Sequence, residues 1–347
     1  MIGPVNYPIR FDPIFKERLW GWRRLQSVLG KRLPPEKLIG ESWEISDQGD
    51  QPSVIANGPL RGHTLRDVMR ESPESLFGSR PVSPPSRPNA ATPRFPLLVK
   101  WIDAREKLSI QVHPPDGHPR LPAGESGKTE CWYVWAAEPG AEIYLGLRRG
   151  IDRAALVHEL ARGTVDRCLN TFPASPGDFF FVPAGTPHTI GAGVLLAEIQ
   201  QTSDTTFRLF DWNRIDPKTS RPRDLQLEPA IDCINFDEFS LGPGIRRMDM
   251  QADFMPLLAA DRCDYFNVSK RRVSESRPIG GPGHCTVLVG LGGTGDVSGG
   301  GETVRVACGD CVLLPACGEF GCDPKPRLEF LEAQLPHATC SISEPAE

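Results

Sequence analysis

The chain has 347 residues, of which 39% are hydrophobic and 24% are charged, proportions typical of a globular protein with room for two domains. Its formal net charge of -5 excludes a general electrostatic attraction to nucleic acid or to an anionic membrane, so an anionic ligand must meet a local cluster of basic side chains. No apolar run is long enough to span a bilayer and the opening residues do not have the pattern of a secretion signal. We therefore expect a cytoplasmic protein with reduced cysteines. We further expect it to be a monomer or a weak dimer.

Three short helices are predicted along the chain. The first covers residues 64–77, where a threonine precedes Asp67 at the spacing of a capping box. The second covers residues 152–162, with an aspartate at its start and a glycine after its end, and the third covers residues 225–234. Residues 78–96 are rich in proline and are predicted to form an extended loop.

Most of the remaining chain has the pattern of short strands and turns, so the predicted fold class is mainly β with a few short helices. Before residue 235, strands are predicted at residues 96–101, 108–113, 131–136, 143–147, 179–182, 194–200 and 207–212. After residue 242, they are predicted at residues 286–290, 303–307, 311–315 and 328–333. The strand pattern changes in character between these two parts of the chain. This change predicts a larger domain at residues 1–238 and a smaller β-domain at residues 239–347.

A polar strand face is expected within residues 108–113. Alternation of side chains places Ser109, Gln111 and His113 on one face of the strand and apolar side chains on the other. A solvent-exposed strand has the same pattern, so this stretch alone favours exposure over a binding site.

A second stretch, residues 177–188, consists of a glycine, an apolar strand and a Pro-x-Gly-x-x-His corner that ends at His188. Its spacing resembles the second cupin motif, in which this histidine binds a metal. The matching first half is His113 and, after a long loop, Glu130 at the start of a strand. Two imidazoles, a carboxylate and the amide of Gln111 suit zinc and also permit manganese, iron or cobalt. Three or four such ligands leave room for water or substrate oxygens.

Longer stretches of the chain resemble the zinc-dependent type I mannose-6-phosphate isomerases, in particular their shorter bacterial form. The most family-specific stretch covers residues 197–214. The other matching stretches are residues 19–21, 39–46, 98–104, 108–114, 127–130 and 184–196.

The resemblance implies a double-cupin fold, with a catalytic metal-binding cupin at residues 1–238 and a degenerate cupin at residues 239–347. It implies an aldose-ketose isomerase that interconverts D-mannose 6-phosphate and D-fructose 6-phosphate through a cis-enediol. It further implies an active-site arginine at Arg208. The proton carrier is not readable from the sequence, and Glu198, Lys128 and a metal-bound water are all admissible. One zinc ion per chain is implied, with Gln111, His113, Glu130 and His188 as its ligands. The implied contacts to the sugar phosphate are Ser109, Lys100 and Lys128.

Other functions stay open from the sequence alone. A cupin could bind a sugar phosphate or regulate without catalysis, or it could be a different enzyme such as an iron-dependent oxygenase. Residues 290–295 match the glycine pattern of dinucleotide-binding proteins, but the next residues cannot open a helix, so we predict a hairpin turn there. Cys308 and Cys311 could hold a structural zinc with two later cysteines, although their spacing is not that of a zinc ribbon.

Overall fold

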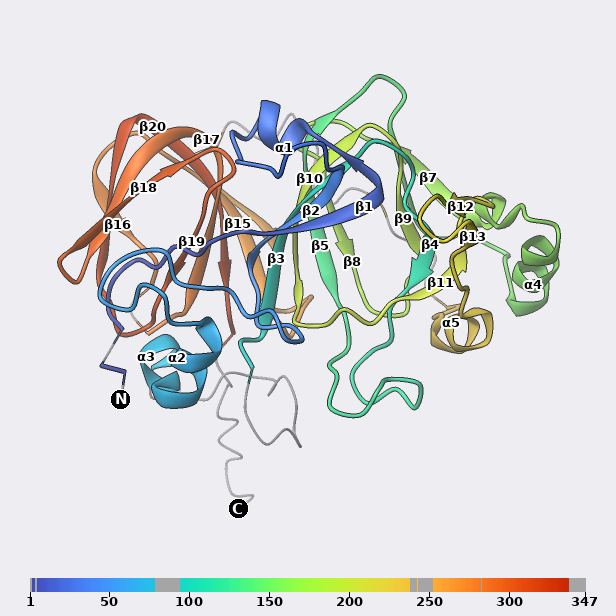
Figure 1. Ribbon diagram of the computed structural model, residues 1–347, viewed down its shortest axis with the longest axis horizontal. Coiled ribbons are helices and arrows are strands. Elements are labelled where there is room, and N and C mark those ends of the chain that lie inside the picture. The colour runs from blue at the N-terminus through green and yellow to red at the C-terminus, as the bar shows by residue number, and fades with distance from the viewer. Residues whose placement is uncertain are drawn as a thin grey trace, which may run out of the picture. The chain divides into compact units, whose positions relative to one another are not determined.

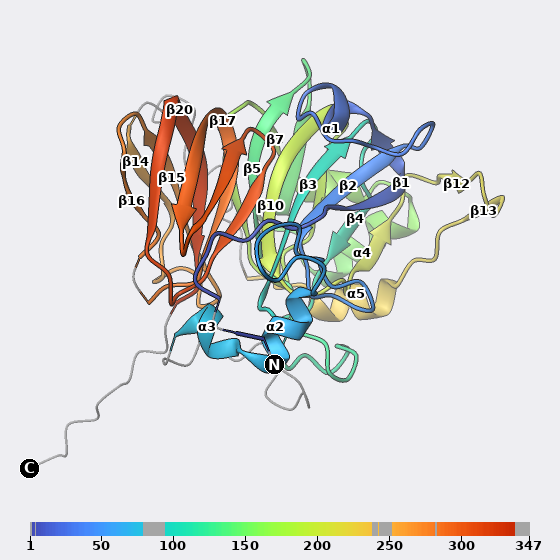
Figure 2. The same cartoon turned by 60° about the vertical axis from the view of Figure 1, so that its left-hand side comes forward.

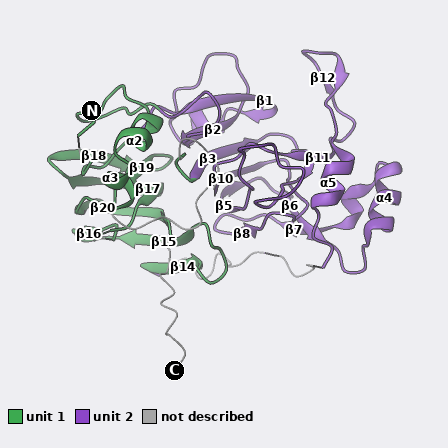
Figure 3. Ribbon diagram, turned by 90° about the horizontal axis from the view of Figure 1, so that it is seen from below, with its two compact units in different colours: residues 1–10, 54–96, 253–347 green, residues 11–53, 97–252 purple. Residues whose placement is uncertain are grey.

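The computed structural model of this chain describes residues 2–3, 5–78, 94–237, 242, 252–281 and 283–336. The chain forms two compact units (Figure 3). Unit 1 contains Met1–Arg10, Val54–Pro96 and Asp253–Glu347, and unit 2 contains Phe11–Ser53 and Leu97–Ala252. Both units are built mainly of antiparallel strands, so the predicted mainly-β fold class is confirmed (Figure 1).

The two units interleave along the sequence in a way that strand patterns do not predict. The expected division cuts the chain once, near residue 238, whereas residues 1–10 and 54–96 belong to the same compact unit as the C-terminal strands. The assignment of residues 1–238 and 239–347 as two cupin domains stays a prediction. Most of the expected proline-rich loop at residues 78–96 lies outside the described residues.

Unit 2 contains two large sheets, which Figure 1 and Figure 2 show from two sides. The first has the order β1-β2-β3-β10-β5-β8 and the second has the order β11-β4-β9-β6-β7. The first sheet consists of β1 (Ile14–Trp22), β2 (Ile39–Ile45), β3 (Leu97–Ala104), β5 (Glu130–Ala137), β8 (Phe179–Val182) and β10 (Val194–Gln201). The second sheet consists of β4 (Ile110–Val112), β6 (Glu142–Leu147), β7 (Leu169–Pro173), β9 (His188–Ile190) and β11 (Phe207–Phe210).

The two sheets of unit 2 share one apolar core. Ile102 and Trp132 from the first sheet and Leu145 and Ile190 from the second belong to the same buried cluster. Burial of such side chains is the main favourable contribution to folding. The core therefore fixes the inner faces of both sheets, from which the polar side chains described below also project.

The outer face of the second sheet is covered as well. Ile110 and Val112 of β4 pack in a second buried cluster with Leu156 and Ile231. These two partners lie on helices α4 (Arg153–Ala161) and α5 (Leu227–Cys233). Because β4 alternates, Gln111 faces the opposite way, toward the first sheet. Exposure of the polar face of β4, which its sequence alone favours, is therefore wrong.

The predicted helices of unit 2 are confirmed with small shifts of their ends. Asp152 caps α4 by accepting a hydrogen bond from the backbone of Ala155, and Gly163 follows the helix with a positive φ of 68°. The remaining elements of unit 2 are α1 (Arg24–Ser27), a 3-10 helix (Val165–Cys168), β12 (Ile215–Asp216) and β13 (Arg221–Pro222). None of the helices within the described residues is long and apolar enough to cross a membrane.

Unit 1 contains one sheet in which β14-β15-β20-β17-β18 follow one another, with β16 paired to β20 and β19 paired to β17. Its strands are β14 (Phe254–Leu258), β15 (Asn267–Val273), β16 (Arg277–Ile279), β17 (Thr286–Gly299), β18 (Glu302–Ala307), β19 (Cys311–Leu314) and β20 (Phe320–Gln334). The helix predicted at residues 64–77 is two helices, α2 (Leu65–Glu71) and α3 (Pro73–Phe77). Proline lacks the amide hydrogen that a continuous helix needs, so Pro73 begins a new one.

The hairpin turn predicted at residues 290–295 is wrong, because these residues lie inside the long strand β17. The register with β20 shifts between Gly290 and Gly292 and again between Gly293 and Gly295. A Cβ atom at Gly290 would lie 2.0 Å from the carbonyl oxygen of Ala307. These glycines therefore permit close backbone approach at bulges, while the turn itself follows β17 at residues 300–301, where both glycines have positive φ.

The capping box predicted before α2 is confirmed and gives a test of local stability. Thr64 accepts a hydrogen bond from the backbone of Asp67, whose carboxylate accepts one from the backbone of Thr64. We expect Thr64→Ala to lower the free energy of unfolding by about 1 kcal/mol, measured by urea denaturation followed by circular dichroism. Thr64→Ser keeps the hydroxyl and is the control. Unfolding of the alanine variant at an unchanged urea concentration would contradict the assigned cap.

Candidate metal centre and active-site cavity

A cavity of about 250 Å³ lies in unit 2, and its wall carries side chains from both sheets. Polar strand faces thus surround a hollow that the apolar core does not fill. Seven of the residues expected from the sequence line it, namely Lys100, Ser109, Gln111, Lys128, His188, Glu198 and Arg208. His113 and Glu130 lie directly behind this wall, in contact with Lys128.

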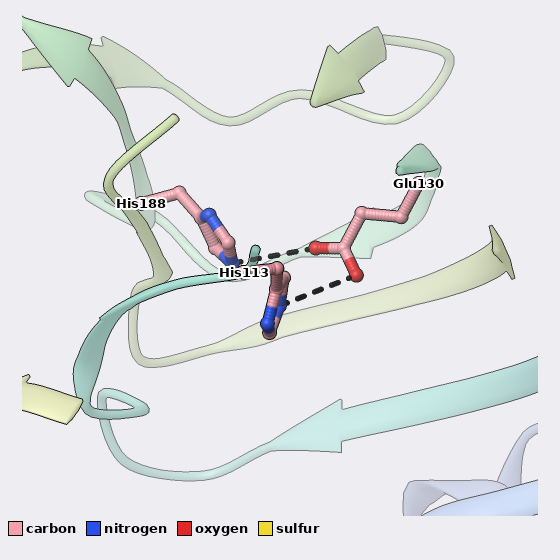
Figure 4. A group of neighbouring side chains, drawn as sticks. All are labelled: His113, Glu130 and His188. Carbon is pink, nitrogen blue, oxygen red and sulfur yellow. Dashed lines mark ion pairs between the residues drawn. The ribbon is translucent and has the colours of Figure 1, made fainter. Parts of the chain in front are cut away.

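His113, Glu130 and His188 form a buried group whose ligand atoms all lie within 4.8 Å of one another (Figure 4). Nε2 of His113 lies 3.6 Å from Oε2 of Glu130, and Nε2 of His188 lies 3.3 Å from Oε1 of the same carboxylate. All three side chains are at most 1% exposed. Within the described residues, no other group of three or more histidine, cysteine or acidic side chains could hold a metal ion.

The orientation of both imidazoles is fixed by backbone carbonyl groups. Nδ1 of His113 lies 3.0 Å from the carbonyl oxygen of Thr205, and Nδ1 of His188 lies 2.8 Å from that of Thr186. A carbonyl oxygen only accepts, so each Nδ1 carries the hydrogen and donates it. Nε2 of each ring therefore carries no hydrogen and has a free lone pair to offer, which is the tautomer that a metal ligand requires.

Burial also sets the protonation state of the group. Burial and the nearby Lys128 hold the pKa of His113 well below its usual value, and burial lowers the pKa of His188 to about 4. Both rings are consequently uncharged at neutral pH, so each Nε2 can offer its lone pair to a metal ion. Burial and the proximity of Glu198 raise the pKa of Glu130 to about 7. A cation bound beside this carboxylate would therefore favour its ionised form.

Gln111 joins this group from the neighbouring strand. It is paired in register with His188 on one side and with Arg208 on the other. Its Nε2 lies 3.3 Å from Nε2 of His188, and its Oε1 accepts a hydrogen bond from Ser109. The sheet therefore presents Arg208, Gln111 and His188 as one row on its inner face.

The opposite wall is a chain of buried charges. Nζ of Lys100 lies 3.0 Å from Oε1 of Glu198, which sits beside it in register on β10. Oε2 of Glu198 accepts a hydrogen bond from Nε1 of Trp132. Burial opposes ionisation of Glu198, but Lys100 outweighs it and the pKa of Glu198 lies below its usual value. Lys128 donates to Oε2 of Glu130 at 2.6 Å and to Nε2 of His113 at 2.8 Å.

Four further charged residues line the cavity without having been singled out from the sequence as site residues: Arg18, Glu41, Asp204 and Arg223. Glu41 accepts hydrogen bonds from Nε of Arg18 at 2.6 Å and from Nε1 of Trp43 at 2.7 Å. Burial raises the pKa of Glu41, but the positive charge of Arg18 lowers it by more, and the resulting pKa is about 2. Glu41 lies in the Ile39–Ser46 stretch that carries part of the family resemblance, which is the one sequence signal that points to it.

The chain is similar in sequence to known phosphomannose isomerases. Residues 9–128 match the model of the phosphomannose isomerase type I catalytic domain. A mannose-6-phosphate isomerase of Bacillus subtilis is 35% identical over 315 residues, which cover 90% of this chain and 95% of the relative. The chain belongs to the type I phosphomannose isomerase family.

Solved structures of phosphomannose isomerases have the same fold. The crystal structure of the mannose 6-phosphate isomerase from Bacillus subtilis is 30% identical and gives a TM-score of 0.79, covering 94% of this chain and 99% of that one. A zinc-bound mannose 6-phosphate isomerase is 15% identical with a TM-score of 0.69, covering 94% and 99%. The second match shows that the fold persists where most of the phosphomannose isomerase sequence has changed.

Proposed function

We propose that this chain interconverts D-mannose 6-phosphate and D-fructose 6-phosphate with one bound zinc ion. The carrying observation is that His113, Glu130 and His188 converge on one point beside a cavity lined by basic side chains. A phosphorylated sugar is anionic, and the chain as a whole has a net charge of -5. The basic side chains of this cavity supply the local positive charge that such a ligand needs.

The donor set fits a divalent cation. Oε1 of Glu130 is buried and has no hydrogen-bond partner, and the Nε2 atoms of His113 and His188 lie 3.6 and 3.3 Å from the same carboxylate. Gln111 adds a neutral amide from the next strand. Two histidines and a carboxylate are a ligand set that zinc accepts, and the zinc-bound relative supports that choice. When bound, zinc would supply Lewis-acid polarisation of the sugar's carbonyl and hydroxyl oxygens.

The remaining residues bind and orient the sugar phosphate. We assign Arg208 as the catalytic arginine, because its guanidinium lines the cavity and offers a planar set of donors to anionic oxygens. Lys100, Ser109 and Lys128 line the same wall and are assigned as further contacts. Lys100 is held in place by its ion pair with Glu198, so its charge is preorganised before substrate binds.

Isomerisation removes a proton from C2 of the aldose and returns it to C1, while the hydroxyl proton moves between O2 and O1. Two buried groups of this chain could hold the transferred proton. Glu198 is ionised at neutral pH and is fixed by Trp132 and Lys100. Lys128 reaches the cavity from the start of the strand that carries Glu130.

Removal of metal is the direct test of the proposed function. We expect protein dialysed against a chelator to lose conversion of mannose 6-phosphate to fructose 6-phosphate, and zinc to restore it to the starting rate. The measurement is a coupled assay of fructose 6-phosphate together with the metal content per chain. Full turnover by metal-free protein would contradict the proposal. Tight binding of sugar phosphate without turnover by zinc-loaded protein would instead favour a non-catalytic cupin. Cytoplasmic location and a monomeric or weakly dimeric state remain predictions.

A further inference from the structure

Arg208 stands out among the cations of the cavity because it makes no ion pair with a described residue. Lys100 pairs with Glu198, Arg18 pairs with Glu41, and Lys128 pairs with the metal-site carboxylate. No carboxylate of the described residues lies within ion-pair distance of Arg208, and its buried Nε has no hydrogen-bond partner. A half-buried guanidinium in this state is stabilised when an anion from outside the chain enters the cavity.

Arg223 is the second cation at this end of the cavity. Its Nε donates to Oδ2 of the buried Asp211 at 2.7 Å, and its Nη2 donates to Oδ1. Arg214 donates to the same carboxylate, so two guanidinium groups share one negative charge. Nη1 of Arg223 makes no hydrogen bond with any described residue, and the side chain lines the cavity. Asp211 therefore holds Arg223 in a fixed position. Its single negative charge does not neutralise both Arg214 and Arg223.

Arg208 and Arg223 also mark where the cavity meets a neighbouring pocket. Both residues line that second pocket, which further contains Thr219, Arg221 and Gln226. Arg208 is two strands away from His188 in the row that runs through Gln111, which corresponds to about 10 Å between backbones. An open-chain sugar whose reacting carbons lie at the metal ligands would thus extend its far end toward these two arginines.

We propose that Arg223 is a specificity-determining residue that, together with Arg208, binds the phosphate group of the sugar, with Asp211 as its positioning residue. This inference rests on the proposed function and assigns the phosphate to one end of the same cavity. Burial and the proximity of Arg223 lower the pKa of Arg208, a repulsion that a phosphate dianion between them relieves. Two planar guanidinium groups match phosphate oxygens better than lysine ammonium groups do.

The test compares Arg223→Gln with Arg221→Gln, which removes the same charge from the neighbouring pocket but not from the cavity wall. For Arg223→Gln we expect KM for mannose 6-phosphate to rise about tenfold to a hundredfold, with a smaller fall in kcat. Inorganic phosphate titrated calorimetrically into zinc-loaded protein should bind more weakly by a similar factor. Arg221→Gln should change both quantities by less than about threefold.

The outcomes separate the two proposals. If the starting protein converts no hexose 6-phosphate, the proposed function fails, while the phosphate titration still tests Arg223. Phosphate affinity that is unchanged in Arg223→Gln, or lost equally in Arg221→Gln, overturns the assignment of Arg223. Arg223→Lys retains a positive charge near Asp211 and removes the planar donor group, so it decides the question if the glutamine variant does not fold. We expect it to weaken phosphate binding several-fold, and an unchanged affinity overturns the inference.

Discussion

His188→Ala is expected to bind zinc at least about a hundredfold more weakly than the starting protein and to lose isomerase activity with it. The imidazole is buried, neutral and directed at Glu130 by its hydrogen bond to the Thr186 carbonyl. Its removal takes away one nitrogen donor and leaves a carboxylate, one imidazole and an amide. These remaining ligands cannot enclose the ion as tightly. Metal content after dialysis against a weak chelator, measured by mass spectrometry, gives the result independently of activity.

A matched control separates loss of the ligand from loss of any histidine. His158 is exposed on α4 and makes no contact with the metal group, so His158→Ala should retain one zinc per chain and full activity. Since His188 also lies against Trp132, the alanine variant leaves a small hollow and should unfold at a somewhat lower temperature. One tightly held zinc per chain in folded His188→Ala would show that the metal lies elsewhere.

The convergence of His113 and His188 could be predicted because each lies in a short motif whose local structure depends on few residues. Alternation along β4 fixes the side to which Gln111 points, and the proline and glycine before His188 end strand β8. The register of β4 with β9 then brings the two stretches together. That register depends on the whole sheet, so the sequence alone supports it through family resemblance and not through local propensity.

Arg18 and Glu41 could not be found in the same way. They lie on β1 and β2, whose mixed sequences do not alternate regularly, and register shifts interrupt the pairing of the two strands. Their ion pair forms across the pairing of β1 with β2 at the edge of the sheet. Asp204 and Arg223 come from connecting segments outside the strands, where no periodic pattern indicates direction. The missed residues are thus those placed by irregular strand pairing or by connecting segments, for which the sequence has no periodic pattern.

Arg208→Ala is expected to keep its zinc and lose most of its activity, with kcat/KM reduced about a hundredfold to a thousandfold or more. The side chain lies in register with Gln111 but touches none of the three metal-binding groups, so metal content should stay at that of the starting protein. Binding energy from a remote phosphate also orients the reacting carbons, which is why kcat should fall as well as the affinity for substrate. Steady-state kinetics and metal analysis on the same preparation check both parts.

The unfolding temperature distinguishes a catalytic role of Arg208 from a structural one. No ion pair within the described residues is lost when the guanidinium is removed, and its buried Nε already lacks a partner. Arg208→Ala should therefore unfold at the same temperature as the starting protein or at a higher one, as expected where a site sacrifices stability for binding. Arg162→Ala, which removes an exposed arginine after α4, should leave kinetics, metal content and unfolding temperature unchanged. Normal turnover by Arg208→Ala would show that the catalytic assignment is wrong, and a large drop in its unfolding temperature would indicate a structural role instead.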